Sequence, residues 1–189
     1  MRVVKKPEER KAEMVAAASK LFAQQGFVRT SVAEIVTAVD VAKGLFYYYF
    51  TTKDDMVKAV VEGYCSYLGN EMLKISNMDI PAQEKMRRIM DHSAWNACFT
   101  EPMLKDLCLP QHAALYSDMC DRLVSHLRPA VETIVAEALH ERGEDVSQAG
   151  MLAGVGMYGV LMMARRGEMT MESAAAMFER MSGLSRCAS

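Results

Sequence analysis

Proline, the residue that most often interrupts a helix, is scarce in this sequence. Only five prolines occur among the 189 residues, and no stretch keeps the alternation of apolar and polar residues that is typical of a half-buried strand. Apolar residues instead recur at intervals of three and four, as they do in amphipathic helices. The sequence therefore predicts an all-α fold, and its 51% of hydrophobic residues provide for a substantial core.

Long apolar runs are also missing. We find none near the roughly 20 residues that span a bilayer. The charged segment 1–10 lacks the apolar stretch of a signal peptide. We therefore expect a cytoplasmic protein with no membrane partner.

Motifs for catalysis and metal binding are a third absence. The sequence offers no nucleophile motif, no phosphate-binding loop and no persuasive pair of carboxylates, so we do not expect an enzyme. None of the five cysteines has the spacing of a zinc site, alone or with His92 and His112. We expect no metal and no cofactor, and most cysteines should be small buried residues in a reducing compartment.

Charge is distributed unevenly along the chain. Residues 1–53 contain nine Lys or Arg and five Asp or Glu, a net charge of +4, whereas the rest contains 13 and 19, a net charge of −6. A basic front on an acidic body suits a nucleic-acid-binding region joined to a different module.

Three helices are predicted in the basic front, over about residues 7–25, 32–39 and 42–48. Their sizes and spacing predict a helix-turn-helix from about Ser31 to Tyr48. In that arrangement the second of the paired helices enters the major groove of DNA.

Local signals support these boundaries. Gly26 suits a left-handed backbone at the end of the first helix. Ser31 and Glu34 have the spacing of a capping box, and Asp40 is one of the few non-glycine residues that tolerate a left-handed turn.

Residues 46–50 are all aromatic, which is more than so short a helix needs for its core. Tyrosine hydroxyls can donate to phosphate oxygens, and Lys43 and Lys53 add positive charge at the two ends of the helix. The alternative is that the three tyrosines only pack a small three-helix core.

These residues resemble the amino-terminal signature of the TetR family of bacterial transcriptional regulators. The resemblance covers about 50 residues and is carried by Leu21-Phe22, Gly26, the run Thr30–Ile35, the run Val41–Phe50, Lys53, Met56 and Ala59-Val60. It implies that Thr30 and Ser31 meet phosphate, and that Lys43, Tyr47 and Lys53 grip the DNA backbone. It also implies that four residues lie at or near base edges, namely Gly44, Leu45, Tyr48 and Tyr49.

Four positions depart from the family pattern. Asp40 replaces a turn glycine, and Ala42 replaces a Ser or Thr cap, which weakens that cap by about 1 kcal/mol. Leu45 stands where a small polar residue is common; it cannot hydrogen-bond a base but could touch a thymine methyl group. Tyr49 stands where His is frequent. No base preference is therefore carried over from the family.

The remainder of the chain also has a helical pattern. Expected helices cover about 53–73, 81–99, a short segment after Glu101-Pro102, 110–141 with a split or kink near Pro129, 147–165 and 171–181. We therefore predict an amino-terminal helix-turn-helix domain, residues 1–52, joined to a larger helical domain, residues 53–189.

The resemblance implies that this larger domain dimerises and encloses a small-molecule pocket. Four glycines in 147–165 suggest close packing of another backbone. With the apolar face of 171–181, this segment could form half of a four-helix interface in a homodimer. Intrachain packing in a monomer is the alternative. Our pocket candidates are Trp95, Asn96, Phe99, His112 and Tyr116. The alternative, which we favour for each residue taken singly, is that it packs in the core.

The leading hypothesis is a DNA-binding repressor that a small apolar or amphipathic ligand releases from a palindromic operator in double-stranded DNA. The effector itself is unknown. The alternative is an architectural or cell-division DNA-binding protein that has no small-molecule effector.

Overall fold

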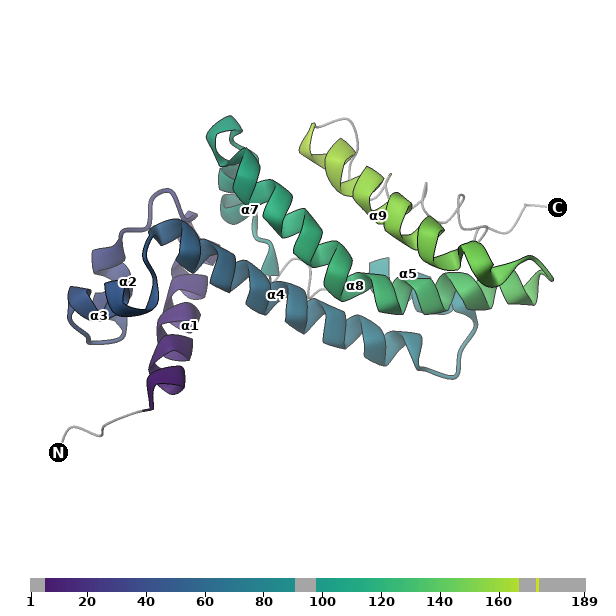
Figure 1. The fold of residues 1–189 in the computed structure, drawn as a ribbon, viewed down its shortest axis with the longest axis horizontal. Coiled ribbons are helices and arrows are strands. Elements are labelled where there is room, and N and C mark those ends of the chain that lie inside the picture. The colour runs from purple at the N-terminus through teal and green to yellow at the C-terminus, as the bar shows by residue number, and fades with distance from the viewer. Residues whose placement is uncertain (1–5, 91–97, 167–172, 174–189) are drawn as a thin grey trace. The chain divides into compact units, whose positions relative to one another are not determined.

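Helices are the only regular elements in the part of the chain that the computed structural model describes, residues 6–90, 98–166 and 173 (Figure 1). These residues fall into two compact units, which are described separately below. The first unit contains residues 6–64 and 98–119, and the second contains residues 65–90, 120–166 and 173.

The first unit begins with α1 (Pro7–Gln25), α2 (Val32–Ala38) and α3 (Lys43–Tyr49). The predicted bounds of these helices agree to within one residue. Their apolar stripes meet in a core of fully buried side chains, because each helix has one apolar face and the three helices bury those faces against one another. The core includes Met14, Ala18, Phe22, Ile35 and Phe46.

Both predicted turns have positive φ angles. Gly26 has a φ of 79° and a ψ of 162°, a combination that lies outside the left-handed helical region and that only glycine adopts readily. Asp40, between α2 and α3, has a φ of 51°. The expected capping box is confirmed, since the Ser31 hydroxyl accepts from the backbone N–H of Glu34, and Glu34 accepts from the backbone N–H of Ser31.

The first unit also contains a segment from much later in the chain. After the start of α4 (Lys53–Ser76), the chain returns in α7 (Glu101–Leu107), the short 3-10 helix η1 (Pro110–His112) and the first residues of α8 (Ala113–Glu141). Met103 and Leu107 are fully buried where α7 packs on α1. The helix-turn-helix is therefore part of a compact unit that extends beyond residues 1–64.

The second unit is built from the rest of α4, α5 (Ala82–Met90), the rest of α8, the 3-10 helix η2 (Val146–Gln148) and α9 (Ala149–Arg165). Leu68, Met86 and Leu123 are among its fully buried side chains. A Cβ placed on Gly69 of α4 would lie 2.7 Å from the carbonyl oxygen of His126 in α8, so these two helix backbones come very close.

The split expected near Pro129 is wrong, because α8 runs unbroken from Ala113 to Glu141. A kink at Pro129 stays a prediction. Proline removes one backbone donor and crowds the preceding turn, but buried residues on both sides of it, such as Leu127 and Ile134, keep the helix packed. The expected helix 81–99 is confirmed as far as Met90; residues 91–97 and the expected helix 171–181 lie outside the described residues, apart from Ser173.

The segment that includes α9 bears on the expectation that no apolar run is long enough to span a bilayer. The segment Val146–Met163 has a mean hydropathy of 1.3 over 18 residues, so by length and composition it could cross a membrane. One such helix is weak evidence, because the core helix of a soluble protein passes the same test.

Candidate nucleic-acid interface

The aromatic residues of α3 and its carboxyl-terminal cap, Phe50, differ in their exposure to solvent. Phe46 and Phe50 are buried, with ring centres 5.6 Å apart. Tyr47 and Tyr48 are 51% and 75% exposed, and Tyr49 is half-buried. Core packing therefore accounts for the two phenylalanines but not for the exposed rings of Tyr47 and Tyr48.

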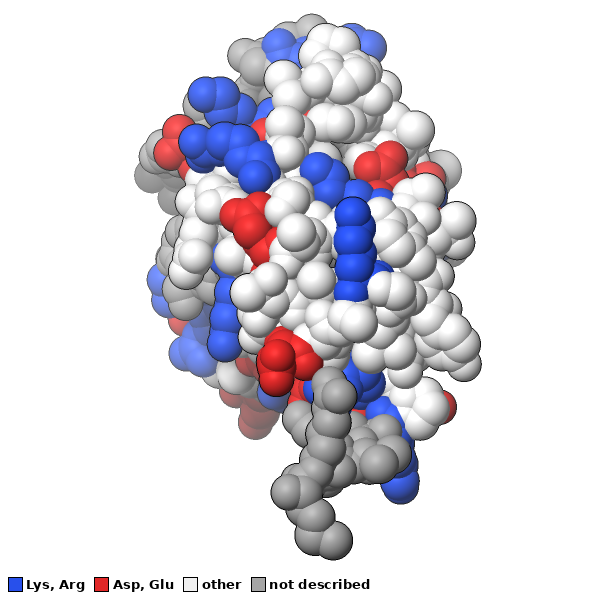
Figure 2. Space-filling view, turned by 90° about the vertical axis from the view of Figure 1, so that its left-hand side faces the viewer, with Lys and Arg blue, Asp and Glu red and all other residues white. Residues whose placement is uncertain are grey.

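Positive charge accompanies the exposed tyrosines. The ammonium group of Lys43 lies 6.0 Å from the centre of the Tyr47 ring, so a cation and a phenol hydroxyl share one surface. Figure 2 looks onto the side where α2 and α3 lie in Figure 1, and Lys and Arg side chains are spread across it with broad uncharged areas and a few acidic side chains between them. This combination suits an anionic backbone.

Gly44 and Leu45 occupy the first turn of α3. No described part of the chain lies within 4 Å of a Cβ placed on Gly44, so the helix backbone is open to an approaching molecule at this point. Leu45 is half-buried, which leaves part of its side chain available for an apolar contact.

Ser31 begins α2 in a dense hydrogen-bond network. Its hydroxyl donates to Glu34 Oε2 at 2.7 Å, and Gln25 Nε2 donates to Glu34 Oε1 at 3.1 Å. The pKa of Glu34 is lowered from its ordinary value of 4.5, first by the backbone N–H of Ser31 and then by the two side-chain donors. Ser31 is exposed, as a phosphate-contacting residue must be, but its hydroxyl proton is engaged by Glu34.

For Thr30 the structure gives a different arrangement from the expected phosphate contact. Thr30 is only 1% exposed, and its hydroxyl donates to the carbonyl oxygen of Gly26 at 2.7 Å. Its backbone N–H donates to the carbonyl oxygen of Phe27. Both donors of Thr30 are therefore used to close the loop between α1 and α2.

Lys53 also has partners inside the domain. Its ammonium group donates to the carbonyl oxygens of Phe27, Val28 and Thr30 at 2.9, 3.3 and 3.2 Å. Lysine has three donors, so the start of α4 is fastened to the loop between α1 and α2. A phosphate contact from Lys53 stays a prediction.

Two residues that contact this loop and the end of α1 could not be predicted from the sequence. Asp106 of α7 accepts from the backbone N–H of Val28 at 2.8 Å, and the hydroxyl of Thr100 donates to the carbonyl oxygen of Ala23 at 3.0 Å. Each pair is separated by more than 70 residues, so no local spacing in the sequence signals these contacts.

The predicted ligand residues are only partly described. Trp95 and Asn96 lie outside the described residues. Phe99 is buried with its ring centre 5.6 Å from that of Tyr64, and Tyr116 is also buried. His112 is half-buried, with its ring tilted against that of Phe27 at 4.9 Å between ring centres. Phe99 and Tyr116 therefore lie in the packed interior of the first unit, and His112 lies at its edge.

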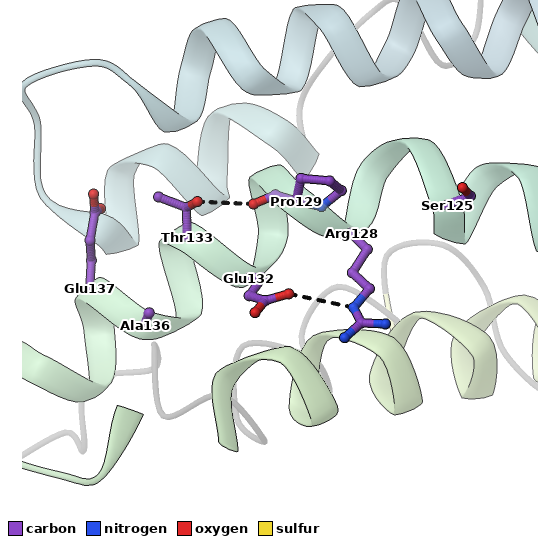
Figure 3. Close-up of a pocket in the computed structure, with 7 residues that line it drawn as sticks. All are labelled: Ser125, Arg128, Pro129, Glu132, Thr133, Ala136 and Glu137. Carbon is purple, nitrogen blue, oxygen red and sulfur yellow. Dashed lines mark hydrogen bonds and ion pairs between the residues drawn. The ribbon is translucent and has the colours of Figure 1, made fainter. Parts of the chain in front are cut away.

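A groove in the second unit is lined by a different set of residues. It has a volume of about 690 Å³ and runs along α8 (Figure 3). Arg128 pairs with Glu132 at 3.5 Å inside it. Its lining residues are Ser125, Arg128, Pro129, Glu132, Thr133, Ala136 and Glu137. It is open to solvent and contains none of the predicted ligand residues. Within the described ranges, no group of three His, Cys, Asp or Glu side chains could hold a metal ion.

Comparison with known proteins agrees with the geometry of the helix-turn-helix. A family model described as "Bacterial regulatory proteins, tetR family" matches residues 14–60. The transcriptional regulator HbdR of Aromatoleum sp. (strain CIB) is 27% identical over 118 residues, which are 62% of this chain and 49% of HbdR. The transcriptional repressor Rv3405c of Mycobacterium tuberculosis is 33% identical over 85 residues, 45% of this chain and 43% of the repressor. The chain matches less than half the length of either relative.

Solved structures share the fold over nearly the whole chain. RolR bound to resorcinol superposes with a TM-score of 0.67 at 18% identity, over 96% of this chain and 90% of RolR. The reduced form of Escherichia coli NemR superposes with a TM-score of 0.58 at 16% identity, over 91% of this chain and 96% of NemR. The architecture is therefore an amino-terminal helix-turn-helix domain followed by a larger helical domain.

Proposed function

Since the amino-terminal region of this chain belongs to the TetR family of bacterial regulatory proteins, we propose that the protein is a ligand-responsive transcriptional repressor. It binds a palindromic operator as a homodimer, in the cytoplasm, and a small apolar or amphipathic molecule releases it. The observation that carries this proposal is the outer surface of α3, where Tyr47 and Tyr48 are exposed beside Lys43 at the second helix of a helix-turn-helix.

The contacts divide into two kinds. Lys43, Tyr47 and the exposed start of α2 at Ser31 would meet phosphates, because cationic and hydroxyl donors suit phosphate oxygens. Gly44, Leu45, Tyr48 and Tyr49 would lie at or near base edges in the major groove. Lys53 would add charge at the end of the same surface while it holds the loop between α1 and α2. Thr30, which is buried, would support the contacts of its neighbours.

The homodimer is supported by α9. Met151 and Val155 are 60% and 64% exposed, one helical turn apart, and Tyr158 follows on the same face. Nothing within the described chain lies within 4 Å of a Cβ placed on Gly154 or Gly159, so another helix backbone can approach there. A two-fold dimer would present two α3 helices to half-sites about 34 Å apart.

Ligand response is supported by the shared fold of RolR, whose structure holds resorcinol. In physical terms, a ligand that prefers a dimer with misplaced recognition helices lowers the fraction of molecules that can bind the operator. Because α4 contributes residues to both units, it is one route by which such a preference reaches the DNA-binding region.

Selection of duplexes from a random-sequence library by the purified protein tests the DNA part of the proposal. The selected sequences should converge on two inverted half-sites, and binding should weaken steeply as the salt concentration rises. Failure to enrich any sequence, or enrichment of a single asymmetric half-site, would contradict it.

The ligand part needs its own experiment. A panel of small phenols, aromatic acids and amphipathic acids is screened for compounds that raise the melting temperature, and each one found is added to the complex with the selected duplex. At least one should lower DNA affinity. If every stabilising compound leaves the affinity unchanged, the architectural or cell-division alternative gains support.

A further inference from the structure

A single carboxylate joins α7 to the loop that precedes the helix-turn-helix. Asp106 Oδ2 accepts a hydrogen bond from the backbone N–H of Val28 at 2.8 Å, and both residues belong to the first unit. Val28 lies in the short connection between α1 and α2, three residues before the Ser31 cap. The contact therefore acts on the backbone segment from which α2 starts.

Gly26 makes room for this carboxylate. A Cβ at position 26 would lie 2.3 Å from Asp106 Oδ2 and 3.1 Å from the carbonyl oxygen of Pro102. The φ of 79° at Gly26 also disfavours any side chain at this position. Glycine at position 26 therefore serves two purposes, since it both ends α1 and lets α7 approach the loop.

Neighbouring contacts align α7 with the loop. The hydroxyl of Thr100, directly before α7, donates to the carbonyl oxygen of Ala23 at 3.0 Å. The ring of His112 packs at a tilt against buried Phe27, and His112 Nδ1 lies 2.7 Å from the carbonyl oxygen of Asp106. The end of α1 and the following loop are thus held by α7 and η1 at three places.

The loop is also held from a second direction. Lys53 at the start of α4 donates to three of its carbonyl oxygens, so α4 binds the acceptors of the loop while Asp106 binds one of its donors. The chain continues from α7 through η1 into α8, whose residues from Cys120 onward belong to the second unit. The helix-turn-helix is therefore linked to the rest of the chain through α7 as well as through α4.

We propose that Asp106 is a positioning residue for DNA binding: by fixing the backbone of Val28 it sets the placement of α2 and α3, so that α7 controls operator affinity alongside α4. The inference rests on the proposed function, because it assigns a control point to the same DNA-binding surface. It predicts that a residue outside the helix-turn-helix changes DNA affinity.

The test compares Asp106→Ala with Glu101→Ala, which removes an exposed carboxylate from the same helix and changes the net charge equally. The probe is the duplex selected by the wild-type protein. Loss of a hydrogen bond to a charged group should weaken binding by Asp106→Ala about tenfold, whereas Glu101→Ala should stay close to wild type. Asp106→Asn keeps an acceptor oxygen and should recover most of the loss. Equal affinities for the two alanine variants, or no recovery by Asp106→Asn, would overturn the proposal.

A second measurement, which needs no DNA, keeps the proposal testable if a variant folds poorly or if the protein binds no duplex. Amide hydrogen exchange in the free protein should be faster for Val28 and for α2 and α3 in Asp106→Ala than in Glu101→Ala, while the buried helices of the second unit exchange at unchanged rates. Unchanged exchange in α2 and α3 would overturn the inference whatever the DNA result. Failure of the wild-type protein to select any duplex would instead contradict the proposed function.

A double-mutant cycle tests whether Asp106 acts through the loop. Because the Cβ of Gly26→Ala would displace the Asp106 carboxylate, the two substitutions remove the same contact. The loss of affinity caused by Gly26→Ala should therefore be smaller in the Asp106→Ala background than in the wild type. Fully additive losses would show that Asp106 acts elsewhere and would count against the proposal.

Discussion

The ammonium group of Lys53, at the start of α4, lies 2.9 Å from the carbonyl oxygen of Phe27, in the loop after α1. Two further loop carbonyls, those of Val28 and Thr30, accept from the same group. Lys53, which the family resemblance predicts to contact DNA, thus has a structural role in this chain, because it satisfies three backbone acceptors that otherwise depend on water.

Replacing Lys53 with Met should therefore lower stability as well as DNA affinity. The methionine keeps the apolar stem but leaves the carbonyls without a charged donor, so the free energy of unfolding should fall by about 1–3 kcal/mol. Urea denaturation measures this loss. Lys58→Met, at an exposed position of the same helix, is the matched control and should change stability far less. Equal stabilities of the two variants would show that the three hydrogen bonds contribute little.

Glu34 predicts a pH dependence that is local to α2. Its pKa is lowered from 4.5, first by the backbone N–H of Ser31 and then by the hydroxyl of the same residue. A lowered folded-state pKa means that the stabilisation is fully present above pH 4.5 and is lost as the pH falls through the folded-state value. The melting temperature of the wild type should therefore approach that of Glu34→Gln between about pH 6 and about pH 3. In Ser31→Ala, an NMR titration should place the Glu34 midpoint closer to 4.5; an unchanged midpoint would argue against the hydroxyl contact.

The helices of the first unit could be predicted because their signals are local. The Ser31–Glu34 capping box and the positive φ of Asp40 depend on residues within a few positions of one another. The split expected at Pro129 was wrong for the opposite reason. A proline weakens a helix locally, but buried side chains on both sides, which no local pattern weighs against it, keep α8 continuous.

The outer surface of α3 was likewise predictable, whereas the environment of the loop before α2 was not. Aromatic crowding at 46–50 predicts that some of those rings are exposed, and Tyr47 and Tyr48 are. Thr30 and Lys53 share the family signature with these residues, yet their donors bind loop carbonyls. Asp106 lies 78 residues from Val28, so only the folded chain brings these two residues together.

Lys43 and Tyr47 should contribute to DNA affinity without selecting sequence. If both contact phosphates, Lys43→Ala and Tyr47→Phe should weaken binding to the selected duplex and to a scrambled duplex by similar factors. Lys43→Ala should also reduce the slope of log affinity against log salt concentration by about one. Fluorescence anisotropy at several salt concentrations measures both quantities. A variant that changes base preference but keeps its general affinity would place that residue at a base edge.

Two glycines of α4 should respond oppositely to alanine. A Cβ on Gly69 would lie 2.7 Å from the carbonyl oxygen of His126, so Gly69→Ala should push α4 from α8 and destabilise the protein by about 1–3 kcal/mol. Among the described residues, nothing lies within 4 Å of a Cβ on Gly63, so Gly63→Ala should stabilise the helix by up to about 1 kcal/mol. Urea denaturation of the two variants compares them directly. Equal effects would mean that α4 and α8 are less closely packed than the structure shows.

The α9 surface gives a test of assembly that is independent of DNA. Val155 is 64% exposed in the single chain, in a helix that carries Met151 and Tyr158 on the same side. If a second copy covers this face, Val155→Asp would bury an unpaired carboxylate in the interface, and the dimer should dissociate at micromolar concentrations. Light scattering coupled to size-exclusion chromatography should then report a mass near 21.0 kDa. Leu73→Asp places the same charge on an exposed apolar residue of α4 and should leave the dimer intact.

A Val155→Asp variant that stays dimeric would move the interface away from this face of α9. A monomeric variant should also bind the palindromic duplex much more weakly than the wild type, because each α3 helix would then engage its half-site alone.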